Sequence, residues 1–329
     1  MRLTTSISLC LMLGATACPQ SGVDEDSVFA RGVPRQETVM MKVPGATSGA
    51  VTVESERQAV LGEIAEWYTN TRAVSGVVNA GAIAVGTLVK LVTLHPPTTV
   101  TVDQAIWGPY QGPLDPIEWK VTVTRIADHQ YHYVFDGRAK NNPAATFVTV
   151  LSGTHLPTIN SAGEELEGFG SGSFTLDWNA RATLPMPNPD EVGTANYDYS
   201  HTGVGEVVQI NAKFRGVKDK DQPGKLVDAD YAFVQKPKSD GSMNFQYVVP
   251  ASAASAGSTA KVHSRWLWSG AGRSDVSAVA TNLPITFTVS ECWDVNYLSQ
   301  YKNVPLAAAA QNYGNETDCA FPTAEFPTP

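Results

Sequence analysis

Hydrophobic and polar residues alternate strictly along most of the chain after residue 98. In the segment 208–214, for example, Val208, Ile210, Ala212 and Phe214 are separated by polar residues. The same two-residue period recurs in 119–123, 131–135, 147–151, 174–184, 229–233, 243–249, 262–268 and 285–289. Such alternation is typical of antiparallel strands that bury one face and expose the other.

Turn-forming residues connect these segments. Asp240-Gly241 is a strong hairpin signal, and Pro223-Gly224 and Gly270-Ala271-Gly272 mark further turns. Consecutive hairpins predict an antiparallel meander of about nine to eleven strands, which is too many for a flat open sheet. We therefore expect a mainly β domain whose meander curls into a barrel or half-barrel, with a sandwich as the alternative.

A helical pattern precedes the strands, over about residues 55–92. Ser55 with Gln58 forms a capping box, and apolar residues then recur at helical spacing: Val60, Ile64, Trp67 and Val74. After Ser75-Gly76, residues 77–89 are uncharged and apolar all round, up to a stop at His95-Pro96-Pro97. This predicts one or two helices packed on the apolar face of the sheet; the alternative for 77–89 is insertion into a bilayer or a partner.

The first 17 residues have the form of a secretory signal peptide. One positive charge at Arg2 precedes the short apolar run 7–15, and the small residues Ala15-Thr16-Ala17 precede Cys18. A membrane span would need about 20 apolar residues, so this segment is excluded from fold reasoning.

Two kinds of cleavage fit this site. Ordinary A-x-A cleavage would give a soluble secreted protein, whereas a bacterial lipobox would leave Cys18 acylated; Ala15 stands where a lipobox usually has Leu. Loss of Cys10 leaves three cysteines, and lipid on Cys18 would leave Cys292 and Cys319 as an even pair in an oxidising compartment. We therefore expect a lipoprotein anchored through Cys18, with soluble secretion as the alternative.

The remaining segments complete the predicted organisation. Residues 18–50 are rich in Ser, Gly, Pro and acidic groups, which predicts a lipidated flexible tether before a single β-rich domain over 51–329. Pro19 is unlike the Asp-type signal for inner-membrane retention, which favours the outer membrane. A Cys292–Cys319 disulfide would pin the C-terminal tail to the sheet; two buried free thiols are the alternative.

Composition and motifs argue against several classes of function. The formal net charge is −9 and no basic run occurs, which is unlike a nucleic-acid binder. The chain has no G-x-S-x-G, H-E-x-x-H, P-loop or dinucleotide fingerprint. Asp128, His129 and His132 form the most ligand-like cluster, yet His132 has the alternation of an outward strand residue. We expect no metal site, no cofactor and no enzyme.

Nine aromatic residues fall on the apolar register of the predicted strands: Phe174, Trp178, Phe214, Tyr231, Phe233, Phe245, Tyr247, Trp266 and Trp268. They either form a core packed against the helices or line a concavity for a lipid chain or another apolar ligand. The first expectation for function is an anchored carrier or binding module; the alternative is a structural or adhesive lipoprotein that acts through unknown protein partners.

Several strings of residues carry a resemblance to a known group: Trp107-Gly108-Pro109-Tyr110, Trp119–Val123, Leu151–His155, Gly270–Asp275 and Glu291–Asp294. From about Val77 to Phe321 the chain resembles a family of uncharacterised myxobacterial envelope lipoproteins. The resemblance implies an envelope location and the disulfide, and it implies no activity.

Overall fold

We describe the protein from a computed structural model. It describes residues 25–45, 61–112, 114–185, 191–218, 224–236, 238–249, 258–280, 286–305 and 312–327. The signal peptide, Cys18, Ser55 and Gln58 lie outside these ranges.

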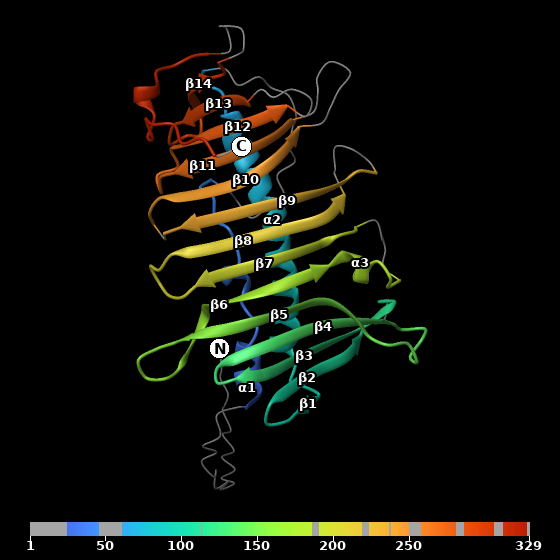
Figure 1. Ribbon diagram of the computed structural model, residues 1–329. Coiled ribbons are helices and arrows are strands. Elements are labelled where there is room, and N and C mark those ends of the chain that lie inside the picture. Colours follow the sequence, from blue (N-terminus) through green and yellow to red (C-terminus); the bar gives the residue numbers. More distant parts are fainter. Residues whose placement is uncertain are drawn as a thin grey trace, which may run out of the picture.

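The described part of the chain forms one antiparallel sheet of 14 strands in sequence order, each paired with the next (Figure 1). The strands are β1 (Thr99–Val100), β2 (Gln104–Gln111), β3 (Ile117–Ala127), β4 (Gln130–Ala139), β5 (Val148–Ile159), β6 (Glu165–Asp177), β7 (Thr194–His201), β8 (Val208–Lys218), β9 (Leu226–Gln235), β10 (Gly241–Val249), β11 (Ser258–Trp266), β12 (Gly272–Ala280), β13 (Thr286–Trp293) and β14 (Ser299–Asn303). The predicted mainly β meander is confirmed. The sheet stays open, because β1 pairs with β2 and β14 pairs with β13 within the described strands.

One long helix, α2 (Glu66–Leu94), crosses the sheet behind the strands (Figure 1). At its start, the backbone N–H of Trp67 donates to the buried carboxylate of Glu291 in β13, at 2.8 Å. Near its end, the indole of Trp107 in β2 donates to the carbonyl oxygen of His95 at 3.0 Å. A helix of 29 residues extends about 43 Å, and α2 therefore holds the two ends of the meander together.

The predicted break at Ser75-Gly76 and the all-round burial of residues 77–89 are wrong. The helix runs through both residues without interruption, since packing of Val78 and Ala82 outweighs a Gly penalty of about 1 kcal/mol. One side of α2 is exposed, with Val77 at 42% and Ile83 at 59% accessibility. By length and composition Glu66–Lys90 could cross a membrane; in this structure the helix packs on the sheet.

A second segment, residues 28–43, packs on the same face as α2, and we call it the N-terminal strap. It follows the start of α1 (Glu25–Arg31) and contains η1 (Gln36–Thr38). Five of its side chains are buried in the core: Phe29, Val33, Val39, Met41 and Val43. Asn79 of α2 bonds both the backbone N–H and the carbonyl oxygen of Met41, at 2.8 and 3.0 Å. The prediction of a flexible tether over 18–50 is therefore wrong for the strap, because its scattered apolar residues find partners on α2 and the sheet.

The predicted number of strands is also too low. β7 and β12 are absent from the predicted set, although β7 alternates through the buried residues Ala195, Tyr197 and Tyr199. Conversely, the alternation that extends through Leu184 in the sequence ends early in the structure. β6 stops at Asp177, whose side chain accepts from the backbone N–H of Ala180 at 2.8 Å and caps the short helix α3 (Trp178–Arg181). A capping side chain here overrides the two-residue pattern.

Candidate functional site

The inner face of the sheet, which α2 covers, holds most of the aromatic residues expected from the sequence. Five are at most 5% exposed: Phe174, Phe214, Phe233, Phe245 and Trp266. They belong to one cluster with Val78, Ala82, Val85 and Leu88 of α2 and with the strap residues. The structure thus brings these rings together in a core formed with the chain's own side chains.

The other four predicted aromatic residues are placed differently. Trp178 lies in α3 and stacks on Phe214 with 6.0 Å between ring centroids, and Tyr231 is half-buried beside it. Trp268 is 55% exposed in the turn after β11. The side chain of Tyr247 lies outside the described residues.

Tyrosine and histidine side chains that the sequence interpretation missed also occupy the inner face. Tyr197 donates to the carbonyl oxygen of Val78 in α2 at 3.0 Å. The ring of His155 lies 2.9 Å from the hydroxyl of Tyr199, and burial lowers the pKa of His155 to about 4. Burial likewise raises the pKa of Tyr199 well above its ordinary value. These groups are neutral at pH 7 and serve the packing of the core.

The outer face, opposite α2, carries a continuous row of polar residues that we call the central row. Residues directly opposite in an antiparallel ladder share a face of the sheet. The register connects β2 to β14 through Gln104, Thr124, His132, Thr154, Ser173, Asp198, Asn211, Ala232, Asn244, His263, Asp275, Ser290 and Asn303. Twelve of these thirteen side chains are polar, and Ala232 is the exception.

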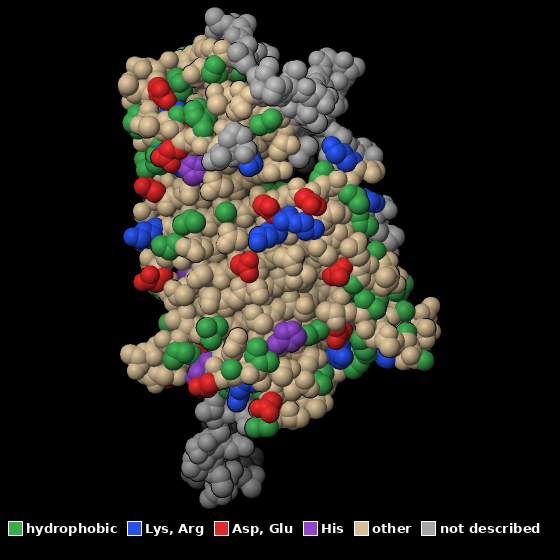
Figure 2. Space-filling model, viewed as in Figure 1, with side chains coloured by type: hydrophobic (Ala, Val, Ile, Leu, Met, Phe, Trp, Pro, Cys, Tyr) green, Lys and Arg blue, Asp and Glu red, His purple; other side chains and the backbone are tan. Residues whose placement is uncertain are grey.

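A groove of about 600 Å³ lies on this face over β7 to β11, and we call it the polar groove. Its polar side chains come from the central row and from the neighbouring row on the same face: Asp198, Asn211, Lys213, Asp230, Asn244, Gln246 and Lys261. Figure 2 shows this face, with charges of both signs over its middle among uncharged polar surface. Pro327 of the C-terminal tail lines the groove as well.

Most of the polar side chains in the groove are uncommitted. Asp230 pairs with Arg215 at 2.7 Å, and Asn244 lies 2.7 Å from His263. Five others have no hydrogen-bond or ion-pair partner among the described residues: Asp198, Asn211, Lys213, Gln246 and Lys261. Donors and acceptors are therefore available to a ligand at no cost in internal bonds.

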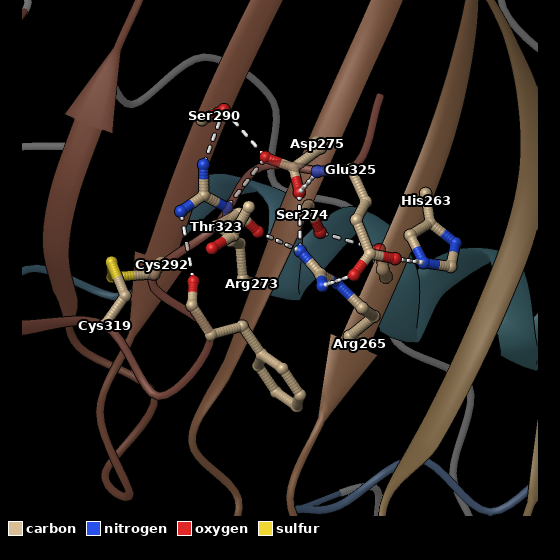
Figure 3. A network of polar contacts seen from close by, with 12 residues as sticks. His263, Arg265, Arg273, Ser274, Asp275, Ser290, Cys292, Cys319, Thr323 and Glu325 are labelled. Atoms are coloured by element: carbon tan, nitrogen blue, oxygen red, sulfur yellow. Dashed lines mark hydrogen bonds and ion pairs between the residues drawn. A yellow bond between two sulfur atoms is a disulfide. The ribbon is translucent and has the colours of Figure 1, made fainter. Parts of the chain in front are cut away.

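Beyond the groove, the central row passes beneath the C-terminal tail, and there its polar groups are fully paired (Figure 3). The carboxylate of Asp275 accepts from Arg273 at 2.8 Å, Ser290 at 2.7 Å, Arg265 at 2.9 Å and the backbone N–H of Glu325 at 2.9 Å. Asp275 and Arg273 are both inaccessible to solvent. We call this arrangement, with its tail residues, the tail clamp.

The tail supplies the remaining partners of the clamp. Arg273 pairs with Glu316 at 2.6 Å, and Arg265 pairs with Glu325. Burial alone would lower the pKa of Arg273, but its bonds to Asp275 and Glu316 raise it above the ordinary value. The predicted disulfide between Cys292 and Cys319 is confirmed, with 5.8 Å between the two Cα atoms. It fixes the tail covalently beside the clamp.

The cluster of Asp128, His129 and His132 expected from the sequence is not formed. His129 instead lies 2.9 Å from the carboxylate of Glu165, while His132 is a member of the central row. Across the described ranges, no three His, Cys, Asp or Glu side chains are grouped so that they could hold a metal ion.

Comparisons of the chain with protein-family models, with curated proteins and with solved structures find no match. The class of protein is therefore defined by its architecture: an open β meander braced by one helix, with a packed inner face and a polar outer face that is open at the groove and closed at the clamp.

Proposed function

We propose that this chain is a lipid-anchored protein of the bacterial envelope that acts as a non-enzymatic binding module through the polar groove. The observation that carries the proposal is the set of five uncommitted polar side chains gathered in one groove of the outer face. Convergent polar groups without internal partners are what a recognition surface needs.

The sequence supports the anchored location. The signal-like residues 1–17 precede Cys18, and the lipoprotein resemblance and the lone cysteine left after disulfide pairing agree with acylation there. Phe29 of the strap is already buried in the core. The ten residues between Cys18 and Phe29 extend at most about 36 Å, so an anchor on Cys18 would hold the domain close to the membrane, in our proposal the outer membrane.

The groove is better supported as the binding surface than the inner face. A carrier of lipid or another apolar ligand needs space among the aromatic rings, and the described rings instead contact α2 and the strap. The alternative from the sequence, a lipoprotein that binds through its surface, agrees with a packed core and an open polar outer face.

The anchor can be tested by metabolic labelling. The full-length chain is expressed in a diderm bacterium supplied with an alkyne-tagged fatty acid, beside the Cys18→Ala variant. The proposal expects label on the wild-type chain and none on the variant. An unlabelled wild-type chain recovered from the medium would leave soluble secretion as the correct alternative.

Binding is tested with the exported Cys18→Ala chain, which separates recognition from anchoring. It is mixed with envelope fragments of the source bacterium and sedimented. We expect retention to weaken at least tenfold when Asn211, Lys213 and Asn244 are all replaced by Ala. The matched control replaces His132, Thr154 and Ser173 by Ala, in the same row but outside the groove. Equal retention of the groove variant and the control would overturn the proposal.

A further inference from the structure

The direction of the polar groove indicates the shape of its ligand. Its lining comes from two neighbouring rows that run across β7, β8, β9, β10 and β11, so the groove crosses the strands. Four strand spacings of about 4.8 Å give a length of about 19 Å. One strand spacing is also close to the length of a sugar ring in an extended chain, so adjacent strands present their side chains at the repeat of a polysaccharide.

The donor and acceptor inventory of the groove fits hydroxyl groups. The amides of Asn211 and Gln246 each offer an acceptor oxygen and a donor NH₂ group, Lys213 and Lys261 offer donors, and Asp198 offers acceptors. A sugar hydroxyl donates and accepts at once. Neighbouring hydroxyls on one ring can therefore bond both polar atoms of a carboxylate or an amide.

The charge of the groove is balanced. Lys213 and Lys261 contribute two positive charges, and Asp198 and Asp230 contribute two negative charges. A surface that binds nucleic acid or another polyanion through charge needs an excess of Lys and Arg, and one that binds a polycation needs the reverse. A neutral ligand fits this balance better than either.

The groove also lacks the usual anchors of a protein interface. Binding energy between proteins concentrates on buried Trp, Tyr and Arg residues. Tyr231 and Phe245 touch the groove but stand in the inner-face register, opposite one another and packed with the core. Recognition in the groove therefore rests on hydrogen bonds distributed over its length.

Resting on the binding function proposed above, we infer that the polar groove binds a neutral polysaccharide chain that lies across β7 to β11. Each sugar contributes a few solvent-competed hydrogen bonds, so affinity rises with chain length until the groove is filled. Saturation falls at about four sugar rings, one for each strand spacing. Past that length, further sugars lie beyond the groove and add little.

The first experiment is a microarray of neutral and acidic bacterial polysaccharides and oligosaccharides, probed with the purified Cys18→Ala chain. We expect signal on at least one neutral glycan, a loss of at least tenfold in the Asn211→Ala/Lys213→Ala/Asn244→Ala variant, and unchanged signal in the His132→Ala/Thr154→Ala/Ser173→Ala control. Circular dichroism of both variants checks that they fold.

Calorimetry with oligomers of the neutral glycan then measures affinity against chain length. Affinity that increases up to about four rings and then levels supports the inference. Signal restricted to acidic glycans, or no signal on any glycan, overturns it. If envelope fragments still retain the chain through the groove while no neutral glycan binds, the ligand class is wrong and the proposed binding function stands. If the fragments do not retain it, both fail.

Discussion

The two ends of the central row show how the same kind of residue serves two purposes on one face of one sheet. At the tail clamp, Asp275 is inaccessible to solvent and accepts four hydrogen bonds. In the polar groove, Asp198 occupies the same row, is exposed, and has no partner among the described residues. The difference comes from the C-terminal tail, which covers β11 to β14 and ends at the border of the groove.

The comparison teaches that coverage, and not residue type, decides what a polar side chain contributes. A covered carboxylate must be paired or its burial is costly, so the clamp side chains are structural. An uncovered carboxylate can exchange water for a ligand. The sharpest way to break this account is to substitute both kinds of position and compare stability with binding.

The largest expected effect is at the clamp. Asp275→Asn removes the negative charge between Arg265 and Arg273 and leaves buried guanidinium groups without their shared acceptor. We expect the free energy of unfolding to fall by about 3–5 kcal/mol, measured by urea denaturation. Asp198→Asn in the same row is the control, with a change within about 0.5 kcal/mol. Similar losses for both variants would erase the distinction between the two ends.

The next effect concerns the covalent attachment of the tail. Replacing both Cys292 and Cys319 by Ala opens a loop with a sequence separation of 27 residues. We expect a loss of about 3 kcal/mol in the free energy of unfolding, because the unfolded chain is no longer constrained. Glycan and envelope binding should persist at temperatures where the variant is folded. A loss of binding by the folded variant would show that the tail belongs to the recognition surface.

A pH titration compares the two faces. Burial lowers the pKa of His155 on the inner face from 6.5 to about 4, so the unfolded chain binds more protons between these values. This stability is fully present above pH 6.5 and is lost as the pH falls towards 4. We expect about 2 kcal/mol less stability from His155 at pH 5 than at pH 7.

His155→Gln removes this titration while it can still bond Tyr199, and urea unfolding at both pH values measures the difference. His263→Gln is the outer-row control. Burial and Arg265 lower the pKa of His263, whereas Glu325 and Asp275 oppose the shift, so its pH dependence should be smaller. An identical pH dependence in wild type and His155→Gln would contradict the assignment.

The smallest expected effect on stability is in the groove. Lys213→Ala and Lys261→Ala should each change the free energy of unfolding by no more than about 0.5 kcal/mol, because neither side chain has a partner to lose among the described residues. Each should nevertheless weaken retention on envelope fragments several-fold. A marked destabilisation with normal binding would assign these lysines to the fold.

Much of the architecture could be predicted from the sequence. Strict alternation in β8 and β10 and the turn at Asp240-Gly241 were enough for the meander, and cysteine parity was enough for Cys292–Cys319. β12 escaped detection because Arg273, Ser274 and Asp275 are all buried, the first and third beneath the tail. The pairing of Glu291 with Trp67, 224 positions away, leaves no local signal.

The candidate site was not predictable for a related reason. Asn211, Asn244 and Lys261 are ordinary outward residues of three separate strands. They become neighbours when the register aligns the strands, and register depends on turn geometry along the whole meander. The same limit hid the strap, because its apolar residues show no period until α2 and the sheet provide their partners.

Lysine footprinting tests the central claim most directly, because it works even while the ligand is unidentified. The Cys18→Ala chain is treated with an amine-reactive reagent, alone and on envelope fragments, and modification is read by mass spectrometry. We predict that Lys213 and Lys261 react readily alone and become protected on the fragments, whereas the exposed Lys90 of α2 stays equally reactive. Protection of Lys90 with unchanged reactivity of Lys213 and Lys261 would place binding on the helical face and contradict the account.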